Sequence, residues 1–296
     1  MLKQIILSLL FLIFSSNKLI SQSISGKIVS SEDLTPVAFA NIGISDSKYG
    51  TYSNVDGVFT INKEFIKDSS DVIIYAIGYE KNILPNELLS TEETLLVKLI
   101  PKVYEMEDIQ VSAKRVRKVL YGKKRIPPRP LIWSFAPGHK STRIGRSVAI
   151  LVNIPQEQLP IRIYKASVGI FANPFPEALF RVRFMSFNDK TELPDQDLTT
   201  ENLITKFGKV DGWVTFNIDK NSQLINEDTF FIVFENLNLE MANYKESLSD
   251  SPYPLFMLKG FLLGKDKLLL SNAALNHWKE EKEDLVFNFQ YSYEKQ

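Results

Sequence analysis

The sequence predicts an all-β protein made of two sandwich modules, and two features of the chain support this prediction. Short runs rich in Val, Ile, Tyr, Phe and Thr recur along the chain, and Gly, Pro, Asn, Asp and Ser separate them. Within residues 58–62, apolar and more polar side chains alternate, which is the spacing of a strand with one buried face. The 296 residues are 44% hydrophobic and 11% aromatic, so the chain has the material for packed cores.

The first element, residues 1–22, has the layout of a secretory signal. Lys3 precedes an apolar run at residues 5–14, and polar residues follow it at 15–17. This run is too short to span a bilayer, which takes about 20 apolar residues. We therefore expect an exported protein that is cleaved near Ser21 or Gln22 and has no transmembrane segment in its mature chain. An uncleaved anchor is the alternative.

The second element, residues 23–112, is predicted to be a module of short strands. Asp56-Gly57 lies between two strand-like runs, where glycine can take the positive φ of a tight hairpin. About seven strands in this length favour a sandwich. The runs that carry the prediction are residues 24–29, 36–44, 49–53, 58–61, 71–77 and 94–100.

Several motifs of this module resemble the carboxypeptidase-like regulatory domain. They are Gly26-Lys-Ile-Val29, Thr35-Pro-Val-Ala-Phe-Ala-Asn41, Gly50-Thr51, Asn54-Val-Asp-Gly-Val-Phe-Thr-Ile61, Ile77-Gly-Tyr79 and Glu105-Met-Glu-Asp-Ile-Gln-Val111. The resemblance implies a seven-stranded, prealbumin-like Greek-key sandwich, of the kind found in Bacteroidota envelope proteins and ahead of TonB-dependent transporters. It implies a periplasmic or outer-membrane-associated protein and no catalytic residues. Phe39 and Ala40 depart from the family, which usually has glycine and alanine there.

The third element, residues 113–130, is predicted to be an extended basic linker. Residues 114–129 carry eight basic side chains and no acidic one, and three prolines close the segment. Lys123, Lys124 and Arg125 are candidates for attachment to an anionic surface such as lipopolysaccharide. The alternative is a spacer kept extended by self-repulsion or folded onto the acidic first module. Nucleic acid is not expected as a partner of an exported protein.

The fourth element, residues 131–296, is predicted to be a second, jelly-roll-like β-sandwich. Its strand-like runs are residues 148–154, 161–170, 180–187, 212–218, 229–237, 254–262, 268–271 and 284–293. The second module is similar, more loosely, to a module of unassigned role that follows the regulatory domain in some envelope proteins. The similarity lies in residues 180–184, 193–194, 212–216 and 230–235.

Basic and aromatic side chains of this module are the candidate binding residues. Arg181 and Arg183 alternate with apolar neighbours and so occupy one face of a strand. With Arg162 and Lys165 they would form a positive patch for carboxylate or phosphate groups. The alternative is a solvated face on which these arginines pair with Glu235 or Asp219. Trp278 is the candidate for stacking on a sugar ring; Trp133 and Trp213 are weaker ones.

Composition argues against most catalytic sites. The chain has no cysteine, and its two histidines, His139 and His277, cannot form a three-histidine metal site in one chain. His277-Trp-Lys-Glu280 has the His-x-x-Glu spacing of zinc carboxypeptidases, but no histidine follows it. We therefore expect neither a metal nor another cofactor.

These observations predict a non-enzymatic envelope protein for binding or assembly. Its expected partner is an envelope glycan, lipopolysaccharide or an outer-membrane protein. The alternative is a carboxylate-dependent hydrolase that acts on glycan or peptide through the second module. Such an enzyme needs two carboxyl groups close together in a cleft, one of them with a raised pKa.

Overall fold

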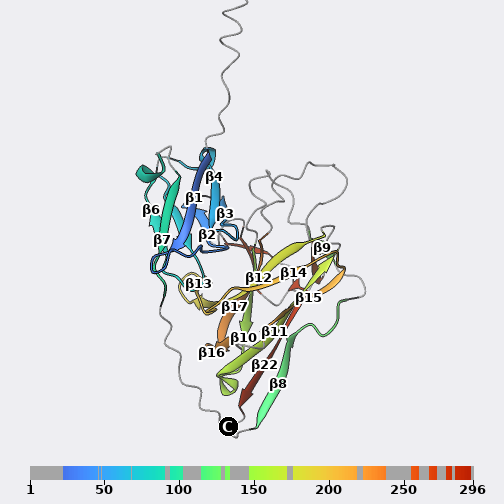
Figure 1. The fold of residues 1–296 in the computed structure, drawn as a ribbon. Helices are drawn as coiled ribbons and strands as arrows, with labels where there is room; N and C mark the ends of the chain where they lie inside the picture. Colours follow the sequence, from blue (N-terminus) through green and yellow to red (C-terminus); the bar gives the residue numbers. More distant parts are fainter. Residues whose placement is uncertain are drawn as a thin grey trace, which may run out of the picture.

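The structure is a computed structural model, and it confirms the all-β prediction (Figure 1). It describes residues 23–45, 47, 49–67, 69–90, 94–102, 115–127, 131–133, 147–171, 176–218, 223–237, 255–259, 267–271, 278–281 and 284–294. The strands of these residues form four sheets. The helices within the same ranges are short 3₁₀ turns, and none of them has the length and apolar character to cross a membrane.

The N-terminal module is the expected seven-stranded sandwich. One sheet has the order β4-β1-β7 and the other has the order β3-β2-β5-β6. The central strand β1 pairs antiparallel with β4 and parallel with β7. The strands are β1 (Ser23–Ser30), β2 (Asn41–Ile44), β3 (Gly50–Tyr52), β4 (Val58–Asn62), β5 (Val72–Tyr75), β6 (Asn82–Leu84) and β7 (Leu95–Leu99).

Side-chain alternation builds the core of this module. Phe59 and Ile61 of β4 are buried between the two sheets, whereas Val58 is exposed. The turn before β4 depends on Gly57, whose φ is +74°. A Cβ at Gly57 would lie 2.4 Å from the carbonyl oxygen of Ile28, so the predicted positive φ is confirmed. The predicted hairpin is wrong, because β3 and β4 on either side of this turn belong to different sheets.

The C-terminal module consists of two larger sheets. The seven-stranded sheet has the order β13-β12-β17-β10-β19-β20, with β14 also paired to β12. It contains β10 (Ser147–Asn153), β12 (Ala178–Asn188), β13 (Leu193–Asp197), β14 (Leu203–Phe207), β17 (Thr229–Asn236), β19 (Leu268–Ser271) and β20 (Trp278–Glu281).

The eight-stranded sheet has the order β21-β18-β11-β22-β8, with β9 paired to β18 and with β15 and β16 paired to β11. Its strands are β8 (Val116–Gly122), β9 (Leu131–Trp133), β11 (Ile161–Phe171), β15 (Gly212–Asn217), β16 (Gln223–Ile225), β18 (Leu255–Lys259), β21 (Asp284–Leu285) and β22 (Phe287–Glu294).

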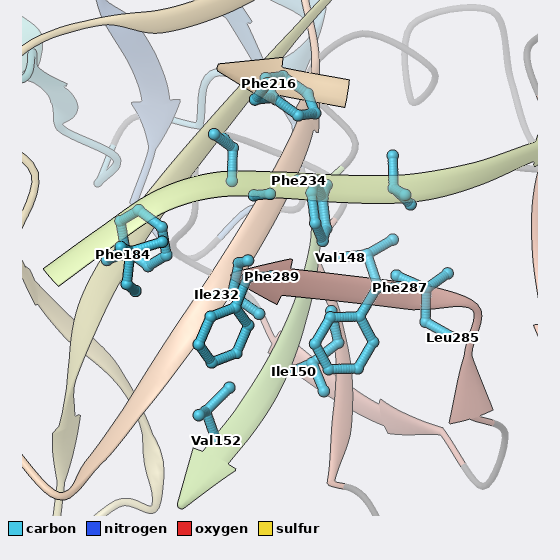
Figure 2. Packing of buried hydrophobic residues seen from close by; sticks show 14 of the residues in the cluster. Val148, Ile150, Val152, Phe184, Phe216, Ile232, Phe234, Leu285, Phe287 and Phe289 are labelled. Carbon is cyan, nitrogen blue, oxygen red and sulfur yellow. The ribbon is translucent and has the colours of Figure 1, made fainter. Parts of the chain in front are cut away.

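Aromatic and aliphatic side chains fill the space between these two sheets (Figure 2). Phe216 of β15 lies 5.8 Å from Phe234 of β17, and Phe230 of β17 lies 6.2 Å from Phe289 of β22, measured between ring centroids. Each pair joins one sheet to the other. Since buried aromatic pairs contribute about 0.5 to 1.5 kcal/mol beyond their area, they help hold the sandwich closed.

Residues 113–130 were predicted to be an extended basic linker, and this prediction is wrong for β8 (Val116–Gly122). β8 pairs with β22 along its whole length, from Val116 opposite Glu294 to Gly122 opposite Asn288. Val119 and Tyr121 of β8 pack against the core of the C-terminal module. Apolar residues at every second position therefore make this segment an edge strand, although its charge count is typical of a linker.

The N-terminal module covers part of the outer face of the seven-stranded sheet. Tyr75 of β5 packs against a buried cluster on that face, which includes Met185, Phe231 and Val233. The opposite face of the same sheet carries Phe184 and contributes to the core of the C-terminal module. This sheet is thus covered on both sides, and the two modules meet at its outer face.

Candidate functional site

Two buried arginines form the centre of the junction between the modules. Arg181 and Arg183 project from β12 on the side opposite Phe184, and their side chains are 0% exposed. Arg181 forms an ion pair through Nε with Oε2 of Glu235, the residue opposite it on β17. Arg183 Nη2 lies 2.8 Å from Oδ2 of Asp197 on β13, and its Nη1 lies 3.5 Å from Oε1 of Glu235. Two positive and two negative groups therefore balance inside the junction.

The N-terminal module supplies hydrogen bonds to the first of these arginines. Arg181 Nη1 donates to the carbonyl oxygen of Phe39 over 2.8 Å, and its Nη2 donates to Oδ1 of Asn41 over 2.8 Å. Asn41 Nδ2 in turn donates to Oε1 of Glu235 over 3.4 Å. Since one guanidinium bonds to both modules, the cluster fixes their relative position.

Two tyrosines of the N-terminal module cover the guanidinium groups. The Tyr52 ring centroid lies 5.6 Å from Cζ of Arg181, and the Tyr75 ring centroid lies 5.4 Å from Cζ of Arg183. Arg183 Nη1 also donates to the hydroxyl oxygen of Tyr75 over 3.4 Å. Aromatic faces attract cations most strongly where water is excluded, as it is here.

Burial and charge set the pKa values of the junction. Burial alone would raise the pKa of the Glu235 carboxyl, but Arg181 and Arg183 outweigh it and hold that pKa below its ordinary value. Burial raises the pKa of both Tyr52 and Tyr75, so their phenols stay protonated. At neutral pH two guanidinium ions, the Glu235 carboxylate and two neutral phenols therefore lie together in this cluster.

An open cleft of about 600 Å³ lies beside this cluster, and both modules line it. The C-terminal module contributes Met185 of β12 and a stretch of β13, and the N-terminal module contributes β2, β5 and the segments after β5 and β7. The lining residues are Gly43, Ile73, Tyr75, Ala76, Tyr79, Glu80, Lys81, Lys102, Met185, Pro194, Asp195, Gln196 and Asp197.

Asp197 connects the cluster to the cleft. Its Oδ2 accepts the hydrogen bond from Arg183, whereas its buried Oδ1 has no hydrogen-bond partner among the residues that the structure describes. Burial raises the pKa of this carboxyl in spite of Arg183. Because Oδ1 is buried, Asp197 forms part of the wall of the cleft and does not present this oxygen to its open space.

The first module matches a known family at residues 24–111. That stretch is a CarboxypepD_reg-like domain. The match runs from β1 to beyond β7, so it contains the two sheets that form the N-terminal half of the junction. The resemblance of residues 23–112 to the carboxypeptidase-like regulatory domain is confirmed.

Solved structures are similar to the chain only at low levels. A clostridial cysteine protease, Cwp84, after propeptide cleavage has 7% identity and a TM-score of 0.38, over 91% of this chain and 70% of that one. The cysteine protease and lectin-like domains of Cwp84, a surface layer associated protein of Clostridium difficile, have 10% identity and a TM-score of 0.38, over 92% and 59%. The VP2 subviral particle of infectious bursal disease virus has 10% identity and a TM-score of 0.21, over 93% and 64%. No curated protein matches the chain.

The structure does not form the predicted four-residue positive patch. Arg181 and Arg183 lie under the CarboxypepD_reg-like domain, in the seven-stranded sheet. Arg162 and Lys165 lie on β11, in the other sheet of the C-terminal module. The alternation of side chains correctly predicted an arginine face and an apolar face for β12. It could not predict that a second module covers the arginine face. Glu235 is the partner of Arg181, in a buried cluster and not on a solvated face.

The other predicted residues are distributed over the molecule. Trp278 of β20 is half-buried and packs against the apolar cluster at the junction, so it is part of that packing and not an open stacking platform. Lys123, Lys124 and Arg125 follow β8, and the last two are exposed. His139 and His277 lie outside the described residues. Within the described ranges, no three His, Asp or Glu side chains are grouped as a metal site would require.

Sequence reasoning missed the residues of the cleft. Tyr75 and Asp197 are more than a hundred positions apart, and only the docking of the CarboxypepD_reg-like domain on β12 and β13 brings them together. The segment Leu193–Asp197 contains a proline and two aspartates, which are uncommon in strands, and it was not among the predicted strands.

Proposed function

We propose that this protein is an exported, non-enzymatic envelope protein that binds a ligand in the cleft between its two modules. The observation that carries the proposal is that both modules line this cleft, next to a buried ion cluster that holds them together. A site at a domain junction with walls fixed by packed side chains is a common place for ligand binding.

The lining favours a polyhydroxylated ligand such as an envelope glycan. Tyr75 and Tyr79 offer aromatic surface for the apolar face of a sugar ring. Gln196 offers an amide group for sugar hydroxyls. Lys81 and Lys102 lie in the same lining as the acidic residues Glu80, Asp195 and Asp197, so both signs of charge are present. A cleft with this mixture of aromatic, amide and charged groups suits a sugar better than a purely apolar molecule.

Binding of purified envelope oligosaccharides to the chain from Ser23 onward tests this proposal. This chain contains every strand that the structure describes. Gln196→Ala and Tyr79→Ala should each weaken binding about tenfold, as expected for the loss of one hydrogen bond or one stacking contact. Gln290→Ala, on β22 and away from the cleft, should leave binding unchanged. A ligand that binds equally well to both cleft variants would contradict the proposal.

Export and the class of partner need separate tests. A reporter enzyme that is active only outside the cytoplasm, fused after residue 22, should be active if residues 1–22 direct export. An outer-membrane protein is the other class of partner expected from the sequence. Capture of one such protein by the wild-type chain, with loss of capture in Gln196→Ala, would assign the cleft to a protein partner instead of a glycan.

A hydrolase is the second candidate function, and Asp197 is the observation in its favour. A buried carboxyl with a raised pKa that lies in a cleft with a second carboxyl, Asp195, is typical of an acid catalyst. The hydrogen bond from Arg183 to Asp197 instead gives this carboxyl a part in holding the junction. Hydrolysis of glycan or peptide substrates that Asp195→Asn abolishes would replace the binding proposal with the catalytic one.

A further inference from the structure

Strand β8 is an open edge of the eight-stranded sheet and carries an unusual density of positive charge. Within the described ranges β8 pairs only with β22, so its other edge is unpaired. Residues 115–127 include six basic side chains and no acidic one, and none of the six forms an ion pair with another described residue. They are Arg115, Arg117, Lys118, Lys123, Lys124 and Arg125.

Exposed apolar side chains lie among these charges. Val116 is 58% exposed and Leu120 is 38% exposed. Because Val119 and Tyr121 point into the core, the alternation of the strand directs Val116, Lys118 and Leu120 to the outer side together. The outer side of β8 thus combines Val116 and Leu120 with Lys118, whose Nζ lies 5.6 Å from the centroid of the Tyr164 ring. By the same alternation Arg117 belongs to the other side of the strand, and Lys123, Lys124 and Arg125 follow its end.

We infer that β8 is a contact surface for a membrane with anionic lipid headgroups. Each basic side chain near such a surface contributes about 1 kcal/mol, and exposed apolar side chains add binding by entering the interfacial layer. Lysines on an edge strand also prevent pairing with other strands, but Val116 and Leu120 would oppose that role if exposed to water. An acidic polysaccharide would be attracted by the charges alone and has no use for the apolar pair.

Co-sedimentation with lipid vesicles tests the inference on the chain from Ser23 onward. The wild-type chain should bind vesicles of phosphatidylcholine mixed with phosphatidylglycerol, and it should not bind vesicles of phosphatidylcholine alone. The triple variant Lys123→Gln, Lys124→Gln, Arg125→Gln should bind the mixed vesicles about 100-fold more weakly. Leu120→Ser should weaken binding about fivefold, and this loss should persist at high salt.

Matched variants away from β8 serve as controls. Lys27, Lys98 and Lys190 are exposed lysines away from β8, and their triple change to Gln removes the same charge. Leu96→Ser removes a leucine that is 62% exposed on β7. Both control variants should bind mixed vesicles as the wild type does. An equal loss in the lysine control would show an effect of net charge and overturn the inference. Binding to a soluble acidic polysaccharide without binding to vesicles would also overturn it.

Discussion

Glu235 is the side chain that neutralises both buried arginines of the junction. Its carboxylate pairs with Arg181 and lies 3.5 Å from Nη1 of Arg183, and its side chain is 0% exposed. Ser147 and Asn41 donate further hydrogen bonds to the same carboxylate oxygen, over 3.5 Å and 3.4 Å. A buried cation is tolerated only where such a partner is present.

Glu235→Gln should therefore lower the free energy of unfolding by about 3 kcal/mol, because it leaves one positive charge of the cluster without a counter-charge. Chemical denaturation of wild type and variant measures the loss. The control is Glu177→Gln, which breaks the ion pair with Lys206 on the surface, where the two side chains are 53% and 62% exposed. This control should lose less than about 1 kcal/mol. Equal losses in the two variants would contradict a central role for Glu235.

Phe39 is held in a conformation that favours glycine. Its φ is +56°, in the left-handed region, while its carbonyl oxygen accepts the hydrogen bond from Arg181. Glycine, which the resemblance to the regulatory domain implied at this position, adopts this backbone conformation without strain. The hydrogen bond to Arg181 depends on the direction of this carbonyl and therefore on the left-handed φ.

The variant Phe39→Gly should be about 1 kcal/mol more stable than Phe39→Ala, because only glycine adopts a left-handed φ without steric cost. Comparing these two variants cancels the loss of the phenyl ring, which is common to both. Thermal unfolding of the two proteins gives the difference. If Phe39→Ala is as stable as Phe39→Gly, the backbone at this position is not strained.

Among the strands, β8 and β12 each have two faces with different surroundings. β12 sends Val182 and Phe184 into the core of the C-terminal module and Arg181 and Arg183 into the junction. β8 sends Val119 and Tyr121 into the same core and its exposed positions outward. The side chains alternate in the sequence of both strands. For β12 this alternation led to the correct prediction of a strand, whereas for β8 the high positive charge led to the prediction of a linker.

The end of β8 depends on Gly122. Its φ is +89°, and a Cβ there would lie 2.5 Å from the carbonyl oxygen of Phe287 on β22. Gly122→Ala should detach this end of β8, because the methyl group would collide with the neighbouring backbone. Hydrogen exchange should show faster exchange of β8 amides by at least about tenfold, with β1 amides of the same molecule unchanged. Unchanged protection of β8 would mean that the strand can shift to accept the side chain.

For the whole molecule, the junction makes stability depend on acid pH. The pKa of Glu235 lies below its ordinary value of about 4.5 in the folded protein. Its contribution is therefore fully present above the ordinary value and is lost as pH falls through the lower, folded value. The pKa of Asp197 is raised, so its contribution to the pH dependence of stability has the opposite sign. A variant that lacks only the Glu235 carboxyl is therefore needed to detect the effect of Glu235.

The stability of the wild type should fall more steeply than that of Glu235→Gln between pH 5 and pH 3, because the variant has no carboxyl to protonate at this position. Urea denaturation at several pH values measures both curves, and their difference reports the effect of the Glu235 charge on the junction, including its effect on the pKa of Asp197. Parallel curves would show that Glu235 has an unshifted pKa and is not held by the arginines.

Most of the long strands could be predicted from the sequence, whereas several short ones could not. β10, β11, β12 and β17 are apolar runs of seven to eleven residues, and the predicted ranges overlap them closely. β6, β13, β14, β16 and β20 have three to five residues each, which is too short for alternation to stand out from loop sequence. Their pairing with longer strands defines them.

The all-β class, the seven-stranded first module and the two-faced pattern of β12 could be predicted without a structure, since all three depend on side-chain period and local turn chemistry. Tertiary structure alone decided that Arg181 and Arg183 meet Glu235, Asn41 and the carbonyl of Phe39. A charged strand face has the same sequence pattern whether water or a second module covers it. Which of the two covers it depends on contacts between residues far apart in the chain, and these contacts place the cleft as well.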